Sequence, residues 1–447
     1  MQFQTEIENW LKENRITEVE CLVPDMTGNA RGKFIPAKKF LKEDSRLPEG
    51  ILAQTVTGEY SDDYWELLDT IDGDMLLEPD ASTARLVPWA NETTGQIIHD
   101  CFAKDGTPHP FSTRAVLKRV LALYEKEGLT PVIAPEMEFY LVERNTNPDM
   151  SLKPPIGRSG RPETARQSYS IDAANEFEPF VEDMYSYGEA MGLDIDTLIH
   201  ESGAAQLEVN FIHGDALDLA DQVFTFKRMV REVALKHDIY ATFMAKPMAT
   251  EPGSAKHIHQ SVVSSADGSN IFATKEGEYS QAFYHYLGGL QKYTSYMMSF
   301  FAPNVNSYRR FTREVSAPIN LHWGWDNRTT GLRVPDAAAK NFRIENRFPG
   351  ADVNPYLSIA ATLACGYLGM KNKIEPSAAF AGNAYEEELA LPRTLEEALR
   401  GLQEDQDIID LFGEKFIQLY TSIKLVEFEE FNQVISSWER EHLLLNV

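Results

Sequence analysis

The feature that most constrains the fold of this chain is a set of four short segments in which polar and apolar residues alternate. They read APEMEFYLV from 134, AQLEVNF from 205, KHIHQS from 256 and NFRIENRFPG from 341. Successive side chains of a strand point to opposite faces, so each segment predicts a β-strand with one polar face. The polar faces, together with Glu201 just upstream of the second segment, carry Glu136, Glu138, Glu208, His257, His259, Ser261, Arg343, Glu345 and Arg347.

This collection of side chains suits divalent metal ions better than any one segment does alone. A single strand with alternating charge is most often the solvent-facing side of a half-buried sheet. Carboxylates with imidazole, and few thiolates, are the ligands expected for magnesium or manganese bound together with phosphates. Five glutamates and a histidine are enough for two or more such ions.

A second group of residues is basic, although the chain as a whole is acidic. Lys and Arg number 42 against 68 Asp and Glu, which gives a net charge of -26. Arginines gathered in such a chain suit bidentate grips on carboxylate and phosphate, and the alternative is a set of structural ion pairs. The candidates are Arg309, Arg310, Arg313, Arg328, Arg333, Lys340, Arg343 and Arg347.

Composition also excludes several partners. The negative charge disfavours nucleic acid and anionic membrane surfaces, although a solvated acidic surface accounts for most of it. Three widely spaced cysteines predict neither a disulfide framework nor a zinc site. The amino-terminal segment reads as a polar amphipathic helix, and no window reaches the roughly 18 apolar residues of a membrane span. We therefore expect a cytoplasmic protein.

The order of elements predicts an α+β protein of two domains, residues 1–107 and 108–447. Strand-like runs dominate the first domain, and residues 103–112 concentrate Gly, Pro and polar residues before Ser112, a good N-cap. In the second domain, residues 145–168 read as a long loop. Helical patterns cover about 112–127, 216–237, 279–301, 354–370 and 427–443.

Several motifs occur in the order found in the glutamine synthetase superfamily, and the chain resembles that family over nearly its whole length. They are VPDMTGNARGKFIP, E-x-E, H-x-H-x-S, NSYRR, NRTTGLRVP and RIENRFPGADVNPY. The resemblance implies an amino-terminal β-grasp domain and a catalytic domain with a curved antiparallel sheet surrounded by helices. It also implies a homo-oligomer of stacked rings, a dodecamer, with active sites between subunits.

The resemblance further implies roles for individual residues. Two Mg²⁺ or Mn²⁺ ions are expected, one held by Glu138, Glu201 and Glu208 and the other by Glu136, His257 and Glu345. Glutamate is expected at Arg310, Arg347 and Gly253, and the transferring phosphate at Arg328 and Arg333, with Arg328 and Arg310 as catalytic groups. ATP is expected to contact His259, Ser261, Arg333, Lys340 and Arg343.

The implied reaction is an ATP-dependent ligation. ATP converts the γ-carboxylate of glutamate into γ-glutamyl phosphate, and a neutral amine then displaces phosphate to form an amide. Ammonia-using members place acids where this chain has Ser316, before an Ala-Pro pair, and Gly58, seven positions before Trp65. The joint absence of these acids favours a bulkier amine than ammonia.

Other departures point to one branch of the family. The altered loop 251–256, together with RGK, FMAKP, HIHQS and WGWDNRT, makes the chain most similar to the γ-glutamylpolyamine synthetases, typified by glutamate–putrescine ligase. Putrescine is thus the leading acceptor. We hypothesise that the acidic aromatic segment 59–66, with Trp323 and Trp325, binds the distal ammonium; the alternative is a surface loop and core aromatics.

Three other functions remain open at this point. An ammonia-using glutamine synthetase would share the whole ligand set. A catalytically silent relative with a structural or regulatory role is disfavoured by the intact metal and arginine positions. A generic two-metal hydrolase would need neither the arginines nor the H-x-H-x-S strand.

Overall fold

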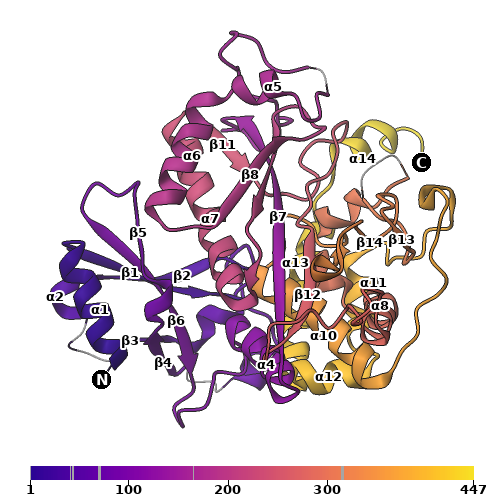
Figure 1. Cartoon of the computed structure of the whole chain (residues 1–447). Helices are drawn as coiled ribbons and strands as arrows, with labels where there is room; N and C mark the ends of the chain where they lie inside the picture. Colours follow the sequence, from indigo (N-terminus) through magenta and orange to yellow (C-terminus); the bar gives the residue numbers. More distant parts are fainter. Residues whose placement is uncertain (1, 41, 43–44, 69–71, 165, 314–316) are drawn as a thin grey trace.

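The computed structural model describes residues 2–40, 42, 45–68, 72–164, 166–313 and 317–447. It contains two sheets, one built from the first hundred residues and one from the rest of the chain, and the long strand β7 runs through the centre of the molecule (Figure 1). This is the α+β class that the sequence predicts.

The first sheet has the strand order β2-β1-β6-β4-β3, with β5 paired to β6. Its central pair, β1 and β6, is parallel, and β1 pairs antiparallel with β2. The apolar face of α1 (Gln2–Glu13) packs here, and Ile7, Leu11, Val19 and Ile97 form a small core. The strands are β1 (Glu18–Pro24), β2 (Ala30–Pro36), β3 (Ser45–Pro48), β4 (Asp74–Pro79), β5 (Arg85–Leu86) and β6 (Thr94–Phe102). This part agrees with the expected β-grasp domain.

Short helical turns complete the first part, and α4 begins the second. The turns are α2 (Ala37–Phe40), η1 (Glu49–Ala53), α3 (Tyr64–Leu67) and η2 (Ala81–Thr83). Ser112 caps α4 (Thr113–Lys126) as predicted, because its hydroxyl accepts a hydrogen bond from the Ala115 amide. Arg114, 1% exposed, binds Asp80 and Asp100 of the first part and Asp221 of the second. These ion pairs tie the two parts together, and a boundary at residue 107 stays a prediction.

The second sheet has nine strands, in the order β13-β14-β15-β12-β7-β9-β8, with β10 and β11 also paired to β7. All its pairs are antiparallel except β13 with β14. The bounds are β7 (Leu129–Glu143), β8 (Ile195–His200), β9 (Gln206–Phe211), β10 (Gly214–Asp215), β11 (Ile239–Thr242), β12 (Ile258–Ser264), β13 (Trp323–Trp325), β14 (Leu332–Val334) and β15 (Ile344–Asn346).

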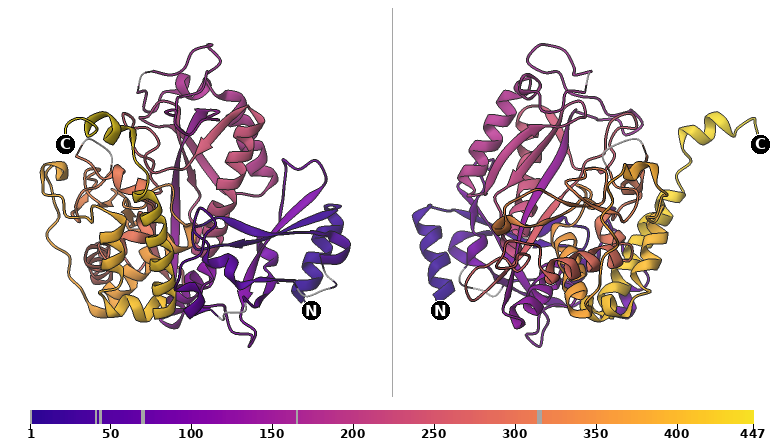
Figure 2. Two further views of the ribbon diagram at one scale, coloured as in Figure 1. Left: turned by 180° about the vertical axis from the view of Figure 1, so that it is seen from behind. Right: turned by 45° about the vertical axis from the view of Figure 1, so that its right-hand side comes forward.

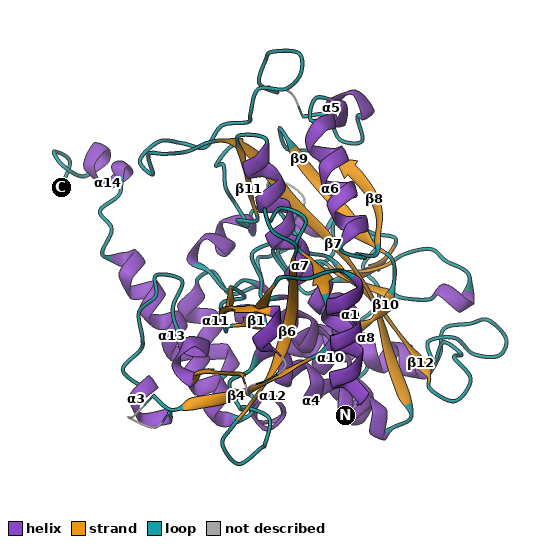
Figure 3. Cartoon of the chain, turned by 90° about the vertical axis from the view of Figure 1, so that its left-hand side faces the viewer, coloured by secondary structure: helices purple, strands orange, loops and turns teal. Residues whose placement is uncertain are grey.

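Helices surround this sheet, and α6 and α7 lie side by side near β8 and β11 (Figures 1 and 3). The α-helices are α5 (Ile171–Asn175), α6 (Glu178–Ala190), α7 (Ala216–Lys236), α8 (Gln281–Tyr293), α9 (Met298–Phe301), α10 (Pro355–Asn372), α11 (Leu395–Leu402), α12 (Gln406–Phe412), α13 (Glu414–Asn432) and α14 (Ser437–His442). Three further turns are η3 (Val305–Arg310), η4 (Ala339–Asn341) and η5 (Ala384–Glu386).

Most helix predictions are confirmed, but the last one is wrong in its bounds. Helices α4, α7 and α10 match their patterns closely, and Asn354 caps α10 by accepting hydrogen bonds from the amides of Tyr356 and Leu357. The pattern 279–301 is divided between α8 and α9. The pattern 427–443 instead spans the end of α13, the turn after it and α14, because Ser436 starts a new helix with its own capping box.

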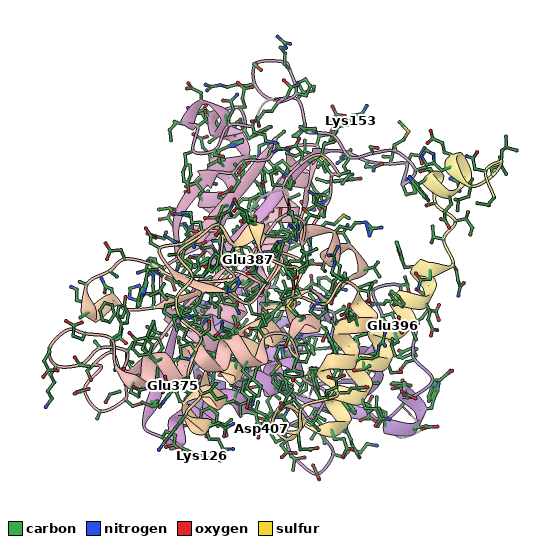
Figure 4. The ribbon with its side chains drawn as sticks, turned by 90° about the vertical axis from the view of Figure 1, so that its right-hand side faces the viewer. Lys126, Lys153, Glu375, Glu387, Glu396 and Asp407 are labelled. Carbon is green, nitrogen blue, oxygen red and sulfur yellow. The ribbon has the colours of Figure 1, made fainter. Side chains whose placement is uncertain are left out.

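Many of the excess acidic residues are exposed on the surface, and helix α14 projects from it. Exposed glutamates such as Glu375, Glu387 and Glu396 surround the helical side of the molecule (Figure 4). Helix α14 stands away from the body (Figures 2 and 3). The three cysteines are buried and free. Within the described ranges, no helix combines the length and apolar character needed to cross a bilayer.

Candidate active site

The register of four adjacent strands brings the predicted metal ligands to one face of the second sheet. Glu138 on β7 pairs directly with Glu208 on β9. On the other side of β7, the Glu136 amide donates to the His257 carbonyl at 2.9 Å, and β12 follows from residue 258. Strand β15 then pairs with β12, so that Glu345 lies opposite His259. Residues more than 200 positions apart therefore meet through strand pairing alone.

Glu136, His257 and Glu345 form what we call the cation-paired group, with one ligand atom from each lying within 4.8 Å of the others. His257 Nδ1 is 3.0 Å from Glu136 and 3.6 Å from Glu345. Burial raises the pKa of Glu136, but hydrogen bonds with His257 and His259 outweigh it and hold this pKa well below its ordinary value.

Glu345 in the same group is compensated by arginine. Its two oxygens accept from Arg347 at 2.5 Å and from Arg333 at 2.7 Å. Burial alone would raise the pKa of Glu345, but Arg347 and the two histidines lower it to about 2. The two glutamates of the cation-paired group therefore stay ionised at neutral pH without help from a bound ion.

Glu138, Glu201 and Glu208 form what we call the acidic group, and its electrostatics are the opposite. Burial and the neighbouring charge of Glu201 raise the pKa of Glu138 to about 8. Burial and the nearby glutamates likewise raise the pKa of Glu208 well above its ordinary value. Burial also raises the pKa of Glu201, against the hydrogen bonds that Ser202 donates to it.

The geometry divides these residues slightly differently from the sequence-based assignment. Glu138 and Glu208 come within 4.8 Å of His257, rather than of Glu201, in the second set of potential ligands. Glu201 lies close enough to raise the pKa of Glu138, and its carboxylate accepts from the Ser202 amide at 3.0 Å. Its role as a metal ligand stays a prediction.

The residues present fit divalent metal ions. The buried His257 Nε2 has no hydrogen-bond partner in the described part of the chain, although buried polar atoms normally have one. Buried carboxylates without cationic partners are likewise costly. The donor set of carboxylate oxygens and one imidazole is the one that Mg²⁺ and Mn²⁺ share. Bound cations would give His257 Nε2 a partner and would also compensate the charge of the buried carboxylates.

A cavity of about 710 Å³ lies beside the cation-paired group, between β7, β12 and the turn η4. Four of the five residues predicted to contact ATP line it, namely His259, Ser261, Lys340 and Arg343. Arg343 Nε donates to His259 Nδ1 at 3.2 Å, and His259 Nε2 lies 2.8 Å from Glu136. The fifth predicted residue, Arg333, is held instead by Asp326 and Glu345.

The same cavity contains residues that the sequence did not single out. Asp196, Phe211 and His213 also line it. His213 follows the end of β9 and belongs to no alternating pattern, so no signal in the sequence marks it. Asp196 lies in β8, whose burial shows no clean alternation.

Three residues predicted to bind glutamate lie together. Buried Arg310 donates to the carbonyls of Phe348 at 2.7 Å and of Arg347 at 2.8 Å. A Cβ at Gly253 would lie 2.6 Å from Arg310 Cγ and 2.8 Å from the Ala245 carbonyl. Only glycine permits this approach, so the altered loop 251–256 still packs its backbone onto Arg310.

The other catalytic candidate, Arg328, is exposed in the turn between β13 and β14, and it faces a residue that the sequence did not reveal. Burial raises the pKa of Tyr169, Arg328 lowers it, and Glu201, Glu208 and Glu136 raise it. Tyr169 therefore lies within electrostatic range of Arg328 and of the candidate metal ligands. Its φ of 60° is left-handed, and its amide donates to the His200 carbonyl at 2.8 Å.

The acidic aromatic segment 59–66 and the two tryptophans occupy separate places in the subunit. Tyr64 is buried and donates to Asp72 at 2.8 Å, whereas Trp65 is 48% exposed. Trp325 packs on Tyr279 and Phe283. Among the described residues, no hydrogen bond or ring contact joins the two places. Gly58 is exposed with a φ of 91°, and Ser316 lies outside the described residues.

Comparison with known proteins accounts for this geometry. The family model "Glutamine synthetase, catalytic domain" matches residues 110–443. The chain belongs to the glutamine synthetase family. It is 34% identical to the γ-glutamylputrescine synthetase PuuA of Escherichia coli K12, over 99% of this chain and 95% of that protein.

Other members of the glutamine synthetase family are nearly as similar. The chain is 33% identical to a glutamate–isopropylamine ligase of a Pseudomonas species, over 97% of this chain and 96% of that one. It is 32% identical to the glutamine synthetase of Pyrococcus woesei, over 96% and 94%. Ligand-free GmaS superposes with a TM-score of 0.83 at 28% identity, covering 97% of this chain and 98% of that structure.

Family membership establishes the class of reaction. Members are ATP-dependent carbon–nitrogen ligases that act on glutamate and use divalent metals, and this chain is such a ligase. The hydrolase and the catalytically silent relative are thereby set aside. Which amine is the acceptor is a separate question, because relatives with different acceptors in their names are about equally similar.

Proposed function

We propose that this ligase joins the γ-carboxylate of glutamate to an organic amine, with putrescine as the leading acceptor. The observation that carries the proposal is the exposed, left-handed Gly58, which stands where the family resemblance places an acid in ammonia-using members. The names of two similar relatives, which specify putrescine and isopropylamine, support it further.

In the proposed site, the cation-paired and acidic groups hold two or more Mg²⁺ or Mn²⁺ ions, and His259, Ser261, Lys340 and Arg343 contact ATP. The bound ions would neutralise charge on the phosphates. Arg310 and Arg347 orient glutamate beside Gly253, and Arg328 and Arg333 face the transferring phosphate. Two observations support this assignment of roles. The four residues assigned to ATP line one cavity at β12, and Gly253 packs on Arg310.

The proposed reaction has two steps. A γ-carboxylate oxygen attacks the terminal phosphorus of ATP, so that a new oxygen–phosphorus bond forms and the bond to ADP breaks. The lone pair of a neutral amine then attacks the carbonyl carbon, phosphate leaves with the bonding electrons, and the nitrogen releases its surplus proton to solvent. Buried arginines contribute by holding the reacting groups in place and by compensating charge.

We further propose a cytoplasmic homo-oligomer of stacked rings, a dodecamer, with active sites between subunits. The projecting α14 supports a contact between copies, because its surroundings expose large apolar side chains that a monomer would leave in water. These are Val434, Ile435, Trp438, Leu444 and Leu445. A variant lacking residues 433–447 should form smaller particles in size-exclusion chromatography with light scattering, and an unchanged mass would contradict this role for the segment.

The test of the function is an ADP-release assay with glutamate, ATP and metal, run with ammonia, monoamines, diamines, polyamines and amino alcohols. Mass spectrometry of the products would identify the γ-glutamyl amide, and reactions without glutamate would control for ATPase activity. We expect diamines to give the highest kcat/KM. Faster turnover of ammonia than of every organic amine at saturation would establish a glutamine synthetase instead.

A further inference from the structure

Gln206, the first residue of β9, contacts a candidate metal ligand without belonging to either set of potential ligands. Alternation along the strand places its side chain on the same sheet face as Glu208, two residues later. The side chain is buried, with 1% of its surface exposed, and its Nε2 donates to Glu138 Oε2 at 3.2 Å. Buried polar groups are normally hydrogen-bonded, so the partners of this amide indicate what it holds in place.

The partners of Gln206 fix which end of its amide faces the acidic group. Its Oε1 accepts from the Gly203 amide at 3.0 Å. Its Nε2 donates to Glu138 and to the Gly253 carbonyl at 3.1 Å, and it lies 3.3 Å from Ser254 Oγ. A backbone N–H only donates and a backbone carbonyl only accepts, so a flipped amide would lose the bonds at both ends. The orientation of Gln206 is therefore determined by its surroundings.

Glu138 is held through one oxygen by two donors. Its Oε2 accepts from Gln206 Nε2 and from the Ala255 amide at 2.8 Å. Ala255 belongs to the same loop 251–256 that carries Gly253. Two hydrogen bonds on one oxygen fix the rotation of a carboxylate, and partners of this kind orient metal ligands in proteins. Gln206 and the loop together therefore set the direction in which Glu138 would face a bound ion.

On its other side, Gln206 holds the loop that is expected to contact glutamate. Its bond to the Gly253 carbonyl has a neighbour, because the Tyr140 hydroxyl donates to the Pro252 carbonyl at 2.8 Å. Tyr140 pairs directly with Gln206 in the sheet. Gly253 in turn packs on Arg310, where an added Cβ would lie 2.6 Å from Arg310 Cγ. The sheet therefore fixes the loop backbone at the two residues that lead up to Arg310.

A primary amide of this length is the side chain that suits position 206. It carries two N–H donors on one nitrogen and an acceptor oxygen beside it, as Glu138, Gly253 and Gly203 require. Methionine has nearly the same length but offers no donor. Asparagine keeps the amide but is shorter by one methylene, so it cannot reach the partners on both sides.

We propose that Gln206 is a positioning residue that holds the candidate metal ligand Glu138 and the glutamate loop at Gly253 in one arrangement. The inference deepens the proposed function and rests on its roles for these two residues, but not on the identity of the acceptor amine. Gln206 acts through a carboxylate and a loop backbone, rather than by contact with the reacting atoms. Loss of its amide should therefore weaken the binding of metal and of glutamate, and leave the binding of ATP in the cavity at β12 as it was.

Gln206→Met tests the proposal, because it removes the amide at nearly constant size. ADP release would be measured with the fastest acceptor of the amine panel, ammonia included, at varied glutamate and at varied ATP. We expect KM for glutamate to rise about tenfold and KM for ATP to stay within about twofold. Electron paramagnetic resonance of Mn²⁺ with the nucleotide-free protein should show a dissociation constant raised about tenfold. Saturating glutamate and Mn²⁺ should restore kcat to within about threefold of wild type.

Gln222→Met is the matched control. Gln222 on α7 is also 1% exposed, and its Nε2 donates to Asp194 and to Asp218 at 2.8 Å each. Its Oε1 accepts from the Asp194 amide at 2.7 Å, so the substitution removes a buried amide that is bonded at both ends, away from the glutamate loop. We expect this variant to lose thermal stability as Gln206→Met does. Its KM for glutamate and its affinity for Mn²⁺ should stay within about twofold of wild type.

Gln206→Asn is the second variant, and it carries the test if Gln206→Met does not fold. It keeps a polar amide in a smaller side chain, and we expect KM for glutamate and the dissociation constant of Mn²⁺ each to rise at least about threefold.

The outcomes separate this role of Gln206 from the proposed function. Increases in KM for glutamate and in the dissociation constant of Mn²⁺ that occur in the Gln206 variants, and not in Gln222→Met, support the role. Values that stay at those of wild type, or that change equally with KM for ATP, would overturn it and leave the ligase function intact. If ammonia proves to be the fastest acceptor, the proposed acceptor is wrong, and the same measurements made with ammonia decide the role of Gln206.

Discussion

The cation-paired group and the acidic group share one sheet face but differ in how their charge is compensated. In the first, histidines and arginines hold Glu136 and Glu345 ionised, with the pKa of Glu345 lowered to about 2. In the second, burial and mutual repulsion raise the pKa of Glu138 to about 8. Five carboxylates on one face are thus not equivalent, and only the acidic group depends on an external cation for its charge.

This contrast teaches that candidate metal ligands can be separated by their role in the metal-free protein. Residues of the cation-paired group contribute to the fold through buried ion pairs. Residues of the acidic group oppose the fold whenever they ionise without a ligand. Substitutions in the two groups should therefore have similar effects on activity and opposite effects on stability.

The largest expected effect is on activity in the acidic group. Glu208→Gln removes a buried carboxylate near the proposed metal, so kcat/KM should fall by at least about 10³-fold. The same substitution removes like-charge repulsion, so the metal-free protein should unfold at a temperature equal to or above that of wild type. ADP release and thermal unfolding in a chelator measure the two effects, and a less stable metal-free variant would contradict the contrast.

The next effect is on stability in the cation-paired group. Glu345→Gln leaves buried Arg347 and partly buried Arg333 without their shared carboxylate, so we expect a loss of about 3 kcal/mol in the free energy of unfolding. Urea unfolding of the metal-free protein measures this loss. Glu208→Gln is the matched control, because it makes the same chemical change on a neighbouring strand. Equal stability of the two variants would contradict the assignment.

The pH dependence of stability should follow the acidic group. The folded pKa of Glu138, about 8, exceeds its ordinary value of 4.5, so the folded state binds more protons between these pH values. Stability therefore falls as pH rises from about 4.5 to 8, by roughly 4 kcal/mol for this residue at about 1.4 kcal/mol per pKa unit. Thermal unfolding in a chelator should show the fall, which saturating Mn²⁺ should suppress and Glu138→Gln should reduce. A pH-independent unfolding temperature would refute it.

The smallest expected effect is at the edge of the cation-paired group. Arg343 contacts His259 and lines the cavity between β7, β12 and η4, and it is half-buried, so Arg343→Ala should raise KM for ATP about fivefold to tenfold. KM for glutamate should stay within about twofold. Arg309, which packs on Phe431 elsewhere, offers a matched control in Arg309→Ala. Equal changes in both KM values would indicate a general structural effect instead.

Much of the site could be predicted because polar residues that alternate along a strand lie on one face of the folded sheet. Glu136, Glu138 and Glu208 share a face as their period requires, and the order of motifs indicated the family. Alternation carries no information about which strands become neighbours, so the placing of His257 in both ligand sets had to come from the register. Tyr169 and His213 lie in loops or at strand ends, where no periodicity exists to mark them.

The helices likewise divide into those that local sequence signals predict and those that they do not. Helices α4, α7 and α10 were predictable because each starts at a local capping signal and continues with an apolar stripe. The pattern 427–443 was wrong in its bounds because α13 already begins after Gly413, and Ser436 starts a new helix with its own capping box. Local signals fix where a helix begins more reliably than where a neighbouring one ends.

His257 belongs to both sets of potential ligands, one with Glu136 and Glu345 and the other with Glu138 and Glu208. Because both sets share this one imidazole, a divalent ion that binds to one set changes the ligands available to an ion at the other set. Titration with a divalent ion should consequently be cooperative or anticooperative rather than a sum of independent isotherms, and by reciprocity each ion alters the affinity of its neighbour by the same factor.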